Sequence, residues 1–493
     1  MTDPKIKYSH PKGLYVLFMA EMWERFCYYG MRGLLTLYLI KILFYQEGDS
    51  YLIYGAYTAL VYLAPVLGGK IADAILGYRK AVIFGAILMS IGEFLIIGGG
   101  SEMLFWGMGF LIVGNGYFKA NISSIVGKLY DEGDSRRDSG FTIFYIGINI
   151  GALLATTVCV YIGETYGSHY GFALAGFGML LGLLFFVGGQ KYYIEKALPP
   201  SVEKLKEKVI GFLPREYAVY LVSILVIPGI YYLVNHNSIV GWVLAFVALG
   251  AIIYLLIEGV KGGKILLHRM IIFIILCILN IVFWALFEQA GTSLTVFADT
   301  NVNRSVLGFE MTAGNTQFFN PFYIIVFGSI FSMMWLKLTE IGKNPSIPMK
   351  FGLGIVQLGL GYLVILLGNE FADATFRVPL WTLGFLYMLH TTGELFISPI
   401  GLSMVTKLAP AHLTGTLMGV WFLSFAGSNY VAGLLATLTG AGGHGTDSIQ
   451  LTPAENLANY VDVYSTMGYS AVGIGIVICL FSPLLNKLMH GIK

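Results

Sequence analysis

The sequence has little charge for its length. Lys, Arg, Asp and Glu make up 12% of its 493 residues, whereas a soluble globular protein carries about 25%. Apolar residues make up 56% of the chain, and its mean hydropathy is +0.74. This shortage of charge excludes an ordinary soluble protein and indicates a polytopic membrane protein. The net charge of +2 gives no sign of nucleic-acid binding.

Motifs of enzymes and pumps are also missing. The four cysteines lie singly in apolar segments, so they predict neither a metal site nor a disulfide framework. No GxxxxGK[ST] motif suggests an ATP-driven pump, and no His/Asp/Glu cluster or serine–histidine arrangement suggests an intramembrane enzyme. His390 is the one histidine inside an expected span, where a lone histidine is more often structural. We therefore expect no catalytic residue, no metal and no cofactor.

The chain has instead a series of long apolar segments bounded by polar or Gly/Pro-rich breaks. The least distinct break is Gly98–Glu102. Fourteen transmembrane spans are expected, at about 14–40, 51–69, 80–99, 103–127, 140–163, 170–190, 216–234, 239–258, 269–298, 318–338, 350–368, 378–405, 412–440 and 460–486.

The distribution of positive charge predicts the orientation of these spans. With a cytoplasmic N-terminus, 24 of the 30 Lys and Arg residues fall on the cytoplasmic side. Lys41, Arg304 and Arg377 fall on the outer side of the membrane, and Arg25, Arg32 and Lys119 fall inside spans. This bias follows the positive-inside rule, so we expect a multi-pass protein of the cytoplasmic (inner) membrane with both termini cytoplasmic.

A long polar stretch divides the spans into six before it and eight after it. The two spans that follow it hold no charge before Glu258 and look like lipid-facing packing. Removing them leaves six plus six, the layout of a two-bundle transporter. We expect an N-terminal six-helix bundle at 14–190, a cytoplasmic linker with two extra helices at 191–268, and a C-terminal six-helix bundle at 269–488.

The first span contains the stretch EMWERFCYYGMR, at residues 21–32. A charge at the bilayer centre costs about 2.5–3.5 kcal/mol, so these charges need a wet environment or partners. At about 100° per residue the polar side chains share an arc of roughly 140°, which predicts a helix that lines an aqueous cavity. The side chains on this face are Glu21, Glu24, Arg25, Tyr28, Tyr29 and Arg32. A Glu21–Arg25 pair at i,i+4 is an alternative, but it leaves Glu24 and Arg32 unexplained.

Other charges stand alone in their spans. Lys119 and Glu394 belong to opposite halves, and a salt bridge across the cavity would remove most of the cost of burying each. Snorkelling or local pairing is the alternative. Glu288 lies toward the outer side, where Arg32 is expected to pair with Glu288 or with Asp299. Glu93 has no obvious partner and receives no role.

Four motifs resemble those of the proton-dependent oligopeptide transporter (POT) family of the major facilitator superfamily. EMWERFCYYG resembles the family's ExxERFxYYG signature, and GGKIADAILGYRK resembles the loop between helices two and three. GNGYFKANISSIVGKLY with FTIFYIGINIGAL resembles the helix 4–5 signature. GELFISPIGLSMVTKLAP with GVWFLSFAGSN resembles the helix 10–11 signature. The resemblance implies an all-α major facilitator fold, with the extra helix pair of bacterial members, and proton-driven uptake of di- and tripeptides by alternating access.

The resemblance also implies roles for individual residues. The proton-coupling set would be Glu21, Glu24 and Arg25, and Lys119 with Glu394 would form the pair between helices 4 and 10. The positions of the other charges add Glu288 to the proton-coupling set, and they add Arg32 and Asp299 to the gating set of Lys119 and Glu394. Arg25 and Lys119 would hold the peptide carboxylate, while Glu394, Asn149 and Asn320 would hold its amino group. Side-chain pockets and the cavity wall would be lined by Tyr28, Tyr29, Tyr62, Trp284, Ser398 and Trp421.

One position departs from the animal members of the family. They carry a histidine seven residues before the tyrosine matched by Tyr62, and this chain has Gly55 there. Proton coupling should therefore rest on carboxylates. A family member that moves nitrate or another small solute is the alternative, but the retention of both a cationic and an anionic pole favours peptides. The expected partners are di- and tripeptides, the proton as coupling ion and the lipid bilayer; a monomer is expected, although the sequence leaves the oligomeric state open.

Overall fold

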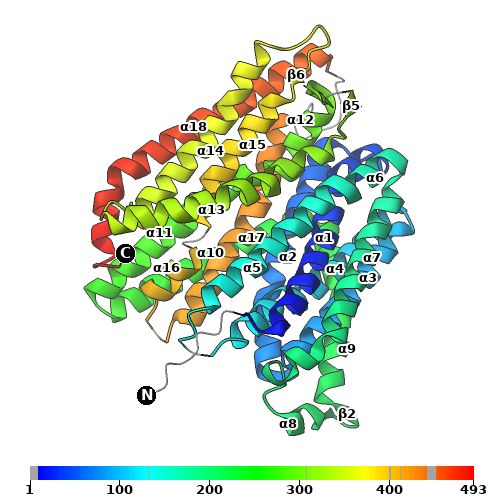
Figure 1. Ribbon diagram of the computed structural model, residues 1–493, viewed down its shortest axis with the longest axis vertical. Helices are drawn as coiled ribbons and strands as arrows, with labels where there is room; N and C mark the ends of the chain where they lie inside the picture. The colour runs from blue at the N-terminus through cyan, green and yellow to red at the C-terminus, as the bar shows by residue number, and fades with distance from the viewer. Residues whose placement is uncertain are drawn as a thin grey trace. The chain divides into compact units, whose positions relative to one another are not determined.

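The computed structural model describes residues 9–131, 133–306, 308–398, 401–410, 412–440 and 451–492. Nearly all of this chain is helical (Figure 1). The helices are α1 (Lys12–Lys41), α2 (Glu47–Ile71), α3 (Tyr78–Ile97), α4 (Gly100–Lys128), α5 (Arg137–Leu154), α6 (Val160–Tyr166), α7 (Ser168–Gly188), α8 (Val202–Lys206), α9 (Arg215–Asn235), α10 (Asn237–Lys261), α11 (Lys264–Phe287), α12 (Ser293–Asn301), α13 (Phe319–Glu340), α14 (Ile347–Asn369), α15 (Trp381–Ile397), α16 (Gly401–Leu408), α17 (Thr414–Ala436) and α18 (Pro453–Leu488).

Short irregular elements interrupt or join these helices. The 3-10 and π turns are η1 (Ala72–Leu76), η2 (Ala155–Cys159), η3 (Gln190–Tyr192), η4 (Ile194–Lys196), η5 (Glu288–Gly291), η6 (Gly314–Phe318) and η7 (Thr437–Thr439). Two-stranded pairs join β1 (Lys208–Ile210) to β2 (Leu213–Pro214), β3 (Val302–Asn303) to β6 (Val378–Pro379), and β4 (Ser305–Val306) to β5 (Phe309–Glu310). The strands lie in connections between the helices, so the fold is all-α as the sequence predicts.

Each predicted span overlaps at least one helix, but the spans 140–163, 269–298 and 378–405 each cover two helices, and residues 399 and 400 of the last lie outside the described residues. The number of spans is not settled. Eleven stretches within the described residues are long and apolar enough to cross a membrane. α1, α4 and α15 are not among them: α1 carries the charges at residues 21–32, α4 is less apolar, and α15 has only 17 residues. A polytopic helical membrane protein is confirmed, and the count of fourteen stays a prediction.

Glycine ends one helix and starts the next at the least distinct predicted break. α3 ends at Ile97, and Gly99 and Gly100 follow with φ of 76° and 81°. These left-handed conformations are open to glycine at little cost. The break predicted at Gly98–Glu102 is therefore a sharp turn between α3 and α4.

The chain forms two compact units that do not follow its order. The first unit is Met1–Arg32 with Leu63–Tyr232, and the second is Gly33–Tyr62 with Leu233–Lys493. The second half of α1 and the first half of α2 thus pack within the second unit. The domain boundaries 14–190, 191–268 and 269–488 stay a prediction.

Glycines spaced by seven residues bring α3 and α4 into contact in the first unit. A Cβ added at Gly85 would lie 2.5 Å from the Gly114 carbonyl oxygen, and one at Gly92 would lie 2.7 Å from the Gly107 carbonyl oxygen. Small residues let backbones approach closely where lipid supplies no hydrophobic drive between helices. This contact fixes α4, which carries Lys119.

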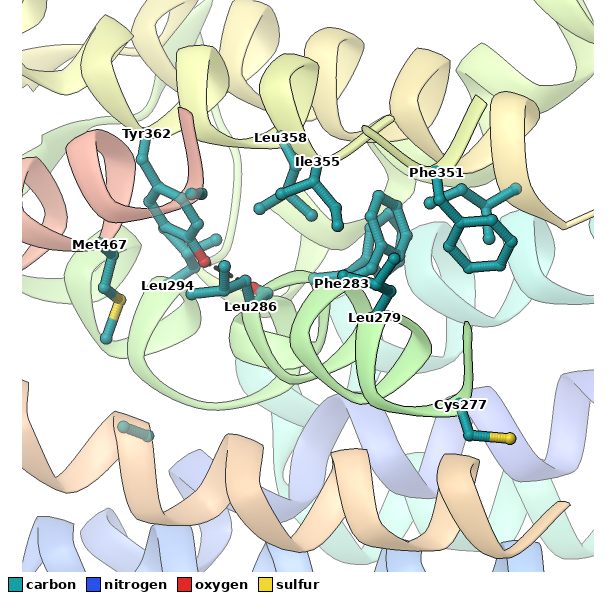
Figure 2. Packing of buried hydrophobic residues seen from close by; sticks show 14 of the residues in the cluster. Cys277, Leu279, Phe283, Leu286, Leu294, Phe351, Ile355, Leu358, Tyr362 and Met467 are labelled. Atoms are coloured by element: carbon teal, nitrogen blue, oxygen red, sulfur yellow. Dashed lines mark hydrogen bonds between the residues drawn. The ribbon is translucent and has the colours of Figure 1, made fainter. Parts of the chain in front are cut away.

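In the second unit, glycines likewise let α14 and α18 approach closely. A Cβ at Gly352 would lie 2.9 Å from the Gly475 carbonyl oxygen, and one at Gly359 would lie 2.7 Å from the Gly468 carbonyl oxygen. α14 also packs against α11 through a buried cluster that includes Phe283, Phe351, Ile355, Leu358 and Tyr362 (Figure 2). The two contacts hold α14 between α11 and α18.

A salt bridge stabilises the connection between α4 and α5. Arg136 donates to both carboxylate oxygens of Asp134, at 3.0 and 2.6 Å, and to the Ser9 carbonyl at 2.6 Å. The hydrogen bonds from Arg136 lower the pKa of Asp134 to about 2. A depressed carboxyl pKa contributes stability that is lost only as the pH falls through that value. The Arg136–Asp134 salt bridge therefore stays intact under mildly acidic conditions.

Candidate substrate and proton site

A buried ion cluster on α1 forms the centre of the site in the first unit. The Arg25 Nη2 donates to Glu24 Oε1 at 2.6 Å, and its Nε contacts both Glu24 Oε2 and, at 3.3 Å, Glu21 Oε1. Glu21, Glu24 and Arg25 are 2%, 0% and 3% exposed. The i,i+4 pair is present, but it is the longer of the two. One guanidinium therefore serves two carboxylates, and it can exchange partners when either carboxylate is protonated.

α4 supplies the polar neighbours of this cluster. Asn115, which the sequence did not suggest, donates from Nδ2 to Glu24 Oε1 at 3.1 Å. Lys119 lies one turn further along the same face of α4 and within electrostatic range of Glu21, Glu24 and Arg25. The first unit thus collects two cations and two carboxylates in one place.

Aromatic rings flank the arginines of α1. The Arg25 guanidinium lies 5.2 Å from the centroid of the Tyr28 ring, and that of Arg32 lies 5.7 Å from the Tyr29 ring. Such cation–π contacts hold a guanidinium without neutralising it. The tyrosine rings therefore do not offset the charge of either arginine. The tyrosines predicted for the wall are thus also neighbours of the cations.

α5 packs tightly against α1 next to the cluster. A Cβ added at Gly151 would lie 2.2 Å from the Met22 carbonyl oxygen. Asn149, two residues earlier, is 5% exposed, and its Nδ2 donates to the Tyr145 carbonyl at 2.9 Å. The role predicted for Asn149, holding the substrate amine, stays a prediction.

The second unit holds the anionic pole. Asn320 at the start of α13 donates from Nδ2 to Glu394 Oε2 at 3.0 Å and to Thr391 Oγ1 at 3.1 Å. The Glu394 side chain is 7% exposed. Asn320 and Glu394, which the resemblance assigns to the peptide amino group, are therefore hydrogen-bonded to each other. Ser398 lies one turn beyond Glu394, at the end of α15, and is exposed.

An aromatic wall of the second unit is built around Phe425, which the sequence did not single out. Its ring stacks on Tyr62 at 5.9 Å between centroids and contacts Trp284 at 5.5 Å and Trp421 at 5.9 Å. The indole Nε1 of Trp284 is buried and has no hydrogen-bond partner among the described residues. The predicted role of Tyr62, Trp284 and Trp421 in lining the substrate cavity stays a prediction.

The C-terminal ends of α1 and α12 are joined by a pair that the sequence did not suggest. Lys41 Nζ lies 2.7 Å from Asp299 Oδ1, and Arg304 Nη2 lies 3.9 Å from the same atom. Glu288 forms the first residue of η5, where the predicted 269–298 span breaks. Arg32 belongs to the other unit, so its pairing with Glu288 or Asp299 stays a prediction.

The gating pair of Lys119 and Glu394 stays a prediction for the same reason, since the two residues belong to different units. The structure places every predicted site residue on a helix or at a helix end. It brings together Glu21, Glu24, Arg25 and Lys119 in the first unit. In the second it brings together Glu394 with Asn320, and Tyr62 with Trp284 and Trp421.

Gly55 lies where the second unit leaves no room for a side chain. A Cβ there would lie 3.0 Å from the Asn429 carbonyl oxygen and 3.1 Å from the Gly433 Cα, while one at Gly433 would lie 2.6 Å from the Tyr51 carbonyl oxygen. α2 and α17 therefore touch backbone to backbone. A histidine at Gly55 would not fit, which explains why the coupling cannot use one here.

The Gly55→His substitution is expected to stop uptake and to lower the free energy of unfolding by about 1–3 kcal/mol, the usual cost of overpacking. Thermal unfolding of the purified protein and uptake into proteoliposomes measure the two effects. Gly48→His is the matched control on the same helix, because its Cβ would meet only Thr437 Cγ2, at 4.0 Å. Equal effects of the two variants would contradict the close contact of α2 with α17.

Comparisons with known proteins agree along the whole chain. A family model described as the POT family matches residues 79–448. The dipeptide and tripeptide permease B of Xenorhabdus bovienii is 33% identical over 489 residues, which cover 98% of this chain and 97% of the relative. The dipeptide and tripeptide permease A of Salmonella typhimurium is 34% identical over 484 residues, covering 98% and 94%.

Solved structures are similar over the same length. The crystal structure of the peptide transporter POT in complex with sulfate has a TM-score of 0.81 at 34% identity, and it covers 98% of this chain and 97% of that one. The crystal structure of a POT family transporter in complex with a thioalcohol conjugated peptide has a TM-score of 0.80 at 30% identity, covering 98% of both chains.

Proposed function

Because the chain belongs to the POT family, we propose that it is a proton-coupled symporter, which imports di- and tripeptides across the cytoplasmic membrane by alternating access. Relatives named as dipeptide and tripeptide permeases and the match to peptide-transporter structures support this substrate class. The proton is the coupling ion, and no other cofactor is needed. The protein works as a monomer with both termini in the cytoplasm.

One observation carries the proposal: the first unit holds buried cations and the second unit holds a buried carboxylate, which suit the two ends of a zwitterionic peptide. Arg25 and Lys119 supply positive charge in the first unit, and Glu394 with Asn320 supplies an acceptor in the second. Fixed charges at both ends recognise only the peptide termini. The aromatic wall around Phe425 then tolerates side chains of many kinds.

The ion cluster on α1 couples the proton to the peptide. While Glu21 and Glu24 are both ionised, Arg25 is neutralised from two sides. Protonation of either carboxylate weakens its hold on the guanidinium, since the attraction depends on its charge. Arg25 then becomes available to the peptide carboxylate. Release of the peptide returns Arg25 to the carboxylates, which favours loss of the proton.

The test is uptake of labelled dialanine into proteoliposomes at two pH values, with competition by unlabelled alanine peptides of one to four residues. Di- and trialanine are expected to compete, whereas alanine and tetraalanine are not. A protonophore is expected to abolish accumulation even with ATP present. Failure of unlabelled dialanine to compete would contradict the peptide assignment and favour a smaller solute such as nitrate.

A further inference from the structure

The second unit contains a column of buried tyrosines from three helices. Tyr51 of α2, Tyr460 and Tyr464 of α18, and Tyr362 of α14 are each fully buried, at 0% exposure. The rings of Tyr460 and Tyr464 stack with centroids 5.6 Å apart, and those of Tyr464 and Tyr362 stack at 5.4 Å. The hydroxyls of Tyr51 and Tyr460 lie close enough to interact. The column is therefore continuous from α2 through α18 to α14.

Titratable groups stand at both ends of this column. At the outer end Glu47, the first residue of α2, lies one turn from Tyr51 and within electrostatic range of Asp299. At the inner end the Tyr362 ring meets His390 edge-on, with centroids 4.8 Å apart. His390 lies one turn before Glu394 on α15. The stacked rings thus reach from Glu47 toward Glu394.

Four buried polar atoms along the column lack a hydrogen bond of good geometry with the described residues. They are the hydroxyls of Tyr51, Tyr460 and Tyr464 and the Nε2 of His390. Polar neighbours do lie close to the hydroxyls: Glu47, Tyr460 and Thr439 beside Tyr51, and Ser293 beside Tyr464. Each unsatisfied buried group is costly, and four of them together would remove a large share of the stability of a folded protein. Buried waters commonly satisfy such groups.

Tyr362 differs from its neighbours in the column. Its hydroxyl donates to the Leu286 carbonyl oxygen at 2.6 Å (Figure 2). The Tyr362 hydroxyl therefore already has a hydrogen-bond partner in the protein. Tyr362 contributes its ring to the packing of the column, but its hydroxyl takes no part in proton transfer. This difference separates a packing role from a role of the hydroxyl groups.

We propose that the column is a proton path of hydroxyl groups and ordered waters, which runs from Glu47 to Glu394 within the second unit. The proposal rests on the proposed proton coupling. A proton taken up by Glu47 passes along the chain as each oxygen accepts one proton and releases another. It ends on the Glu394 carboxylate, so no charge stays on the column. The charged groups at its ends are Glu47, Asp299 and Lys41 outside, and Glu394 with Glu288 inside.

The test is the Tyr464→Phe variant in proteoliposomes, with Tyr460→Phe as a second variant. Gradient-driven uptake of dialanine and peptide-dependent proton entry are expected to fall by about tenfold or more, because a positioned proton-transfer group contributes at least that much. Counterflow of dialanine without a gradient is expected to stay within about twofold of wild type, since both rings and both substrate poles are kept.

Tyr362→Phe is the matched control, because it removes a hydroxyl of the same stack that is already bound to a carbonyl. It is expected to retain gradient-driven uptake. Wild-type proton-driven uptake in both α18 variants would overturn the proton path, and so would the loss of counterflow together with coupling. Absence of gradient-driven dialanine uptake in the wild type would instead overturn the proposed function.

Discussion

Replacing Glu24 with glutamine is expected to abolish proton-driven uptake of dialanine and to leave counterflow largely intact. Glutamine keeps the size of the side chain and can still accept from Asn115, but it can neither bind nor release a proton. Arg25 would keep only one ion pair, the longer contact with Glu21, at 3.3 Å. Removing one partner of a buried ion pair costs about 3–5 kcal/mol when nothing replaces it, so the purified variant should also unfold at a lower temperature.

Asn115→Ala is the matched control for this experiment. It removes the 3.1 Å hydrogen bond to Glu24 but keeps the carboxylate and its arginine. A hydrogen bond to a charged group contributes about 1.5–3 kcal/mol, so this variant should be less stable while its uptake still rises with an inward proton gradient. A Glu24→Gln variant with the pH dependence of the wild type would show that the proton is carried elsewhere.

The polar face of α1 could be predicted from the sequence because it depends on one helix alone. A constant angle per residue places Glu21, Glu24 and Arg25 on one side, and the structure binds all three together. Asn115 and Phe425 could not be found this way. Their importance depends on which helix lies opposite, and an asparagine or a phenylalanine in an apolar span carries no signal of its own.

Helix positions could be predicted more fully than helix interruptions. Apolar length marks a span, because the bilayer requires about 20 apolar residues. The turn at Glu288 and the π turn at residues 155–159 leave no trace in hydropathy, because they follow from packing and hydrogen bonds. The assignment of residues 33–62 to the second unit is also a tertiary effect. It depends on contacts such as that of Gly55 with Gly433.

Replacing Glu394 with glutamine is expected to remove the preference for a free peptide amino group. The wild type should transport dialanine and reject N-acetyl-dialanine, because the blocked amine carries no charge for the carboxylate. The variant should lose concentrative uptake of dialanine, by about tenfold or more if the lost interaction exceeds about 1.4 kcal/mol. Glutamine can still accept the hydrogen bond that Asn320 now gives to Oε2, so the local fold should survive. Competition of each peptide against labelled dialanine measures the preference.

The Lys119→Ala variant tests the recognition of the peptide carboxylate in the same way. It should weaken competition by dialanine but leave C-terminally amidated dialanine, which lacks the carboxylate, as poor a competitor as before. Asn320→Ala serves as the control for Glu394→Gln, because it removes the hydrogen bond and keeps the negative charge. If Glu394→Gln still distinguishes dialanine from its acetylated form as the wild type does, Glu394 does not read the amino group. The two arms together decide whether the two units read opposite ends of one peptide.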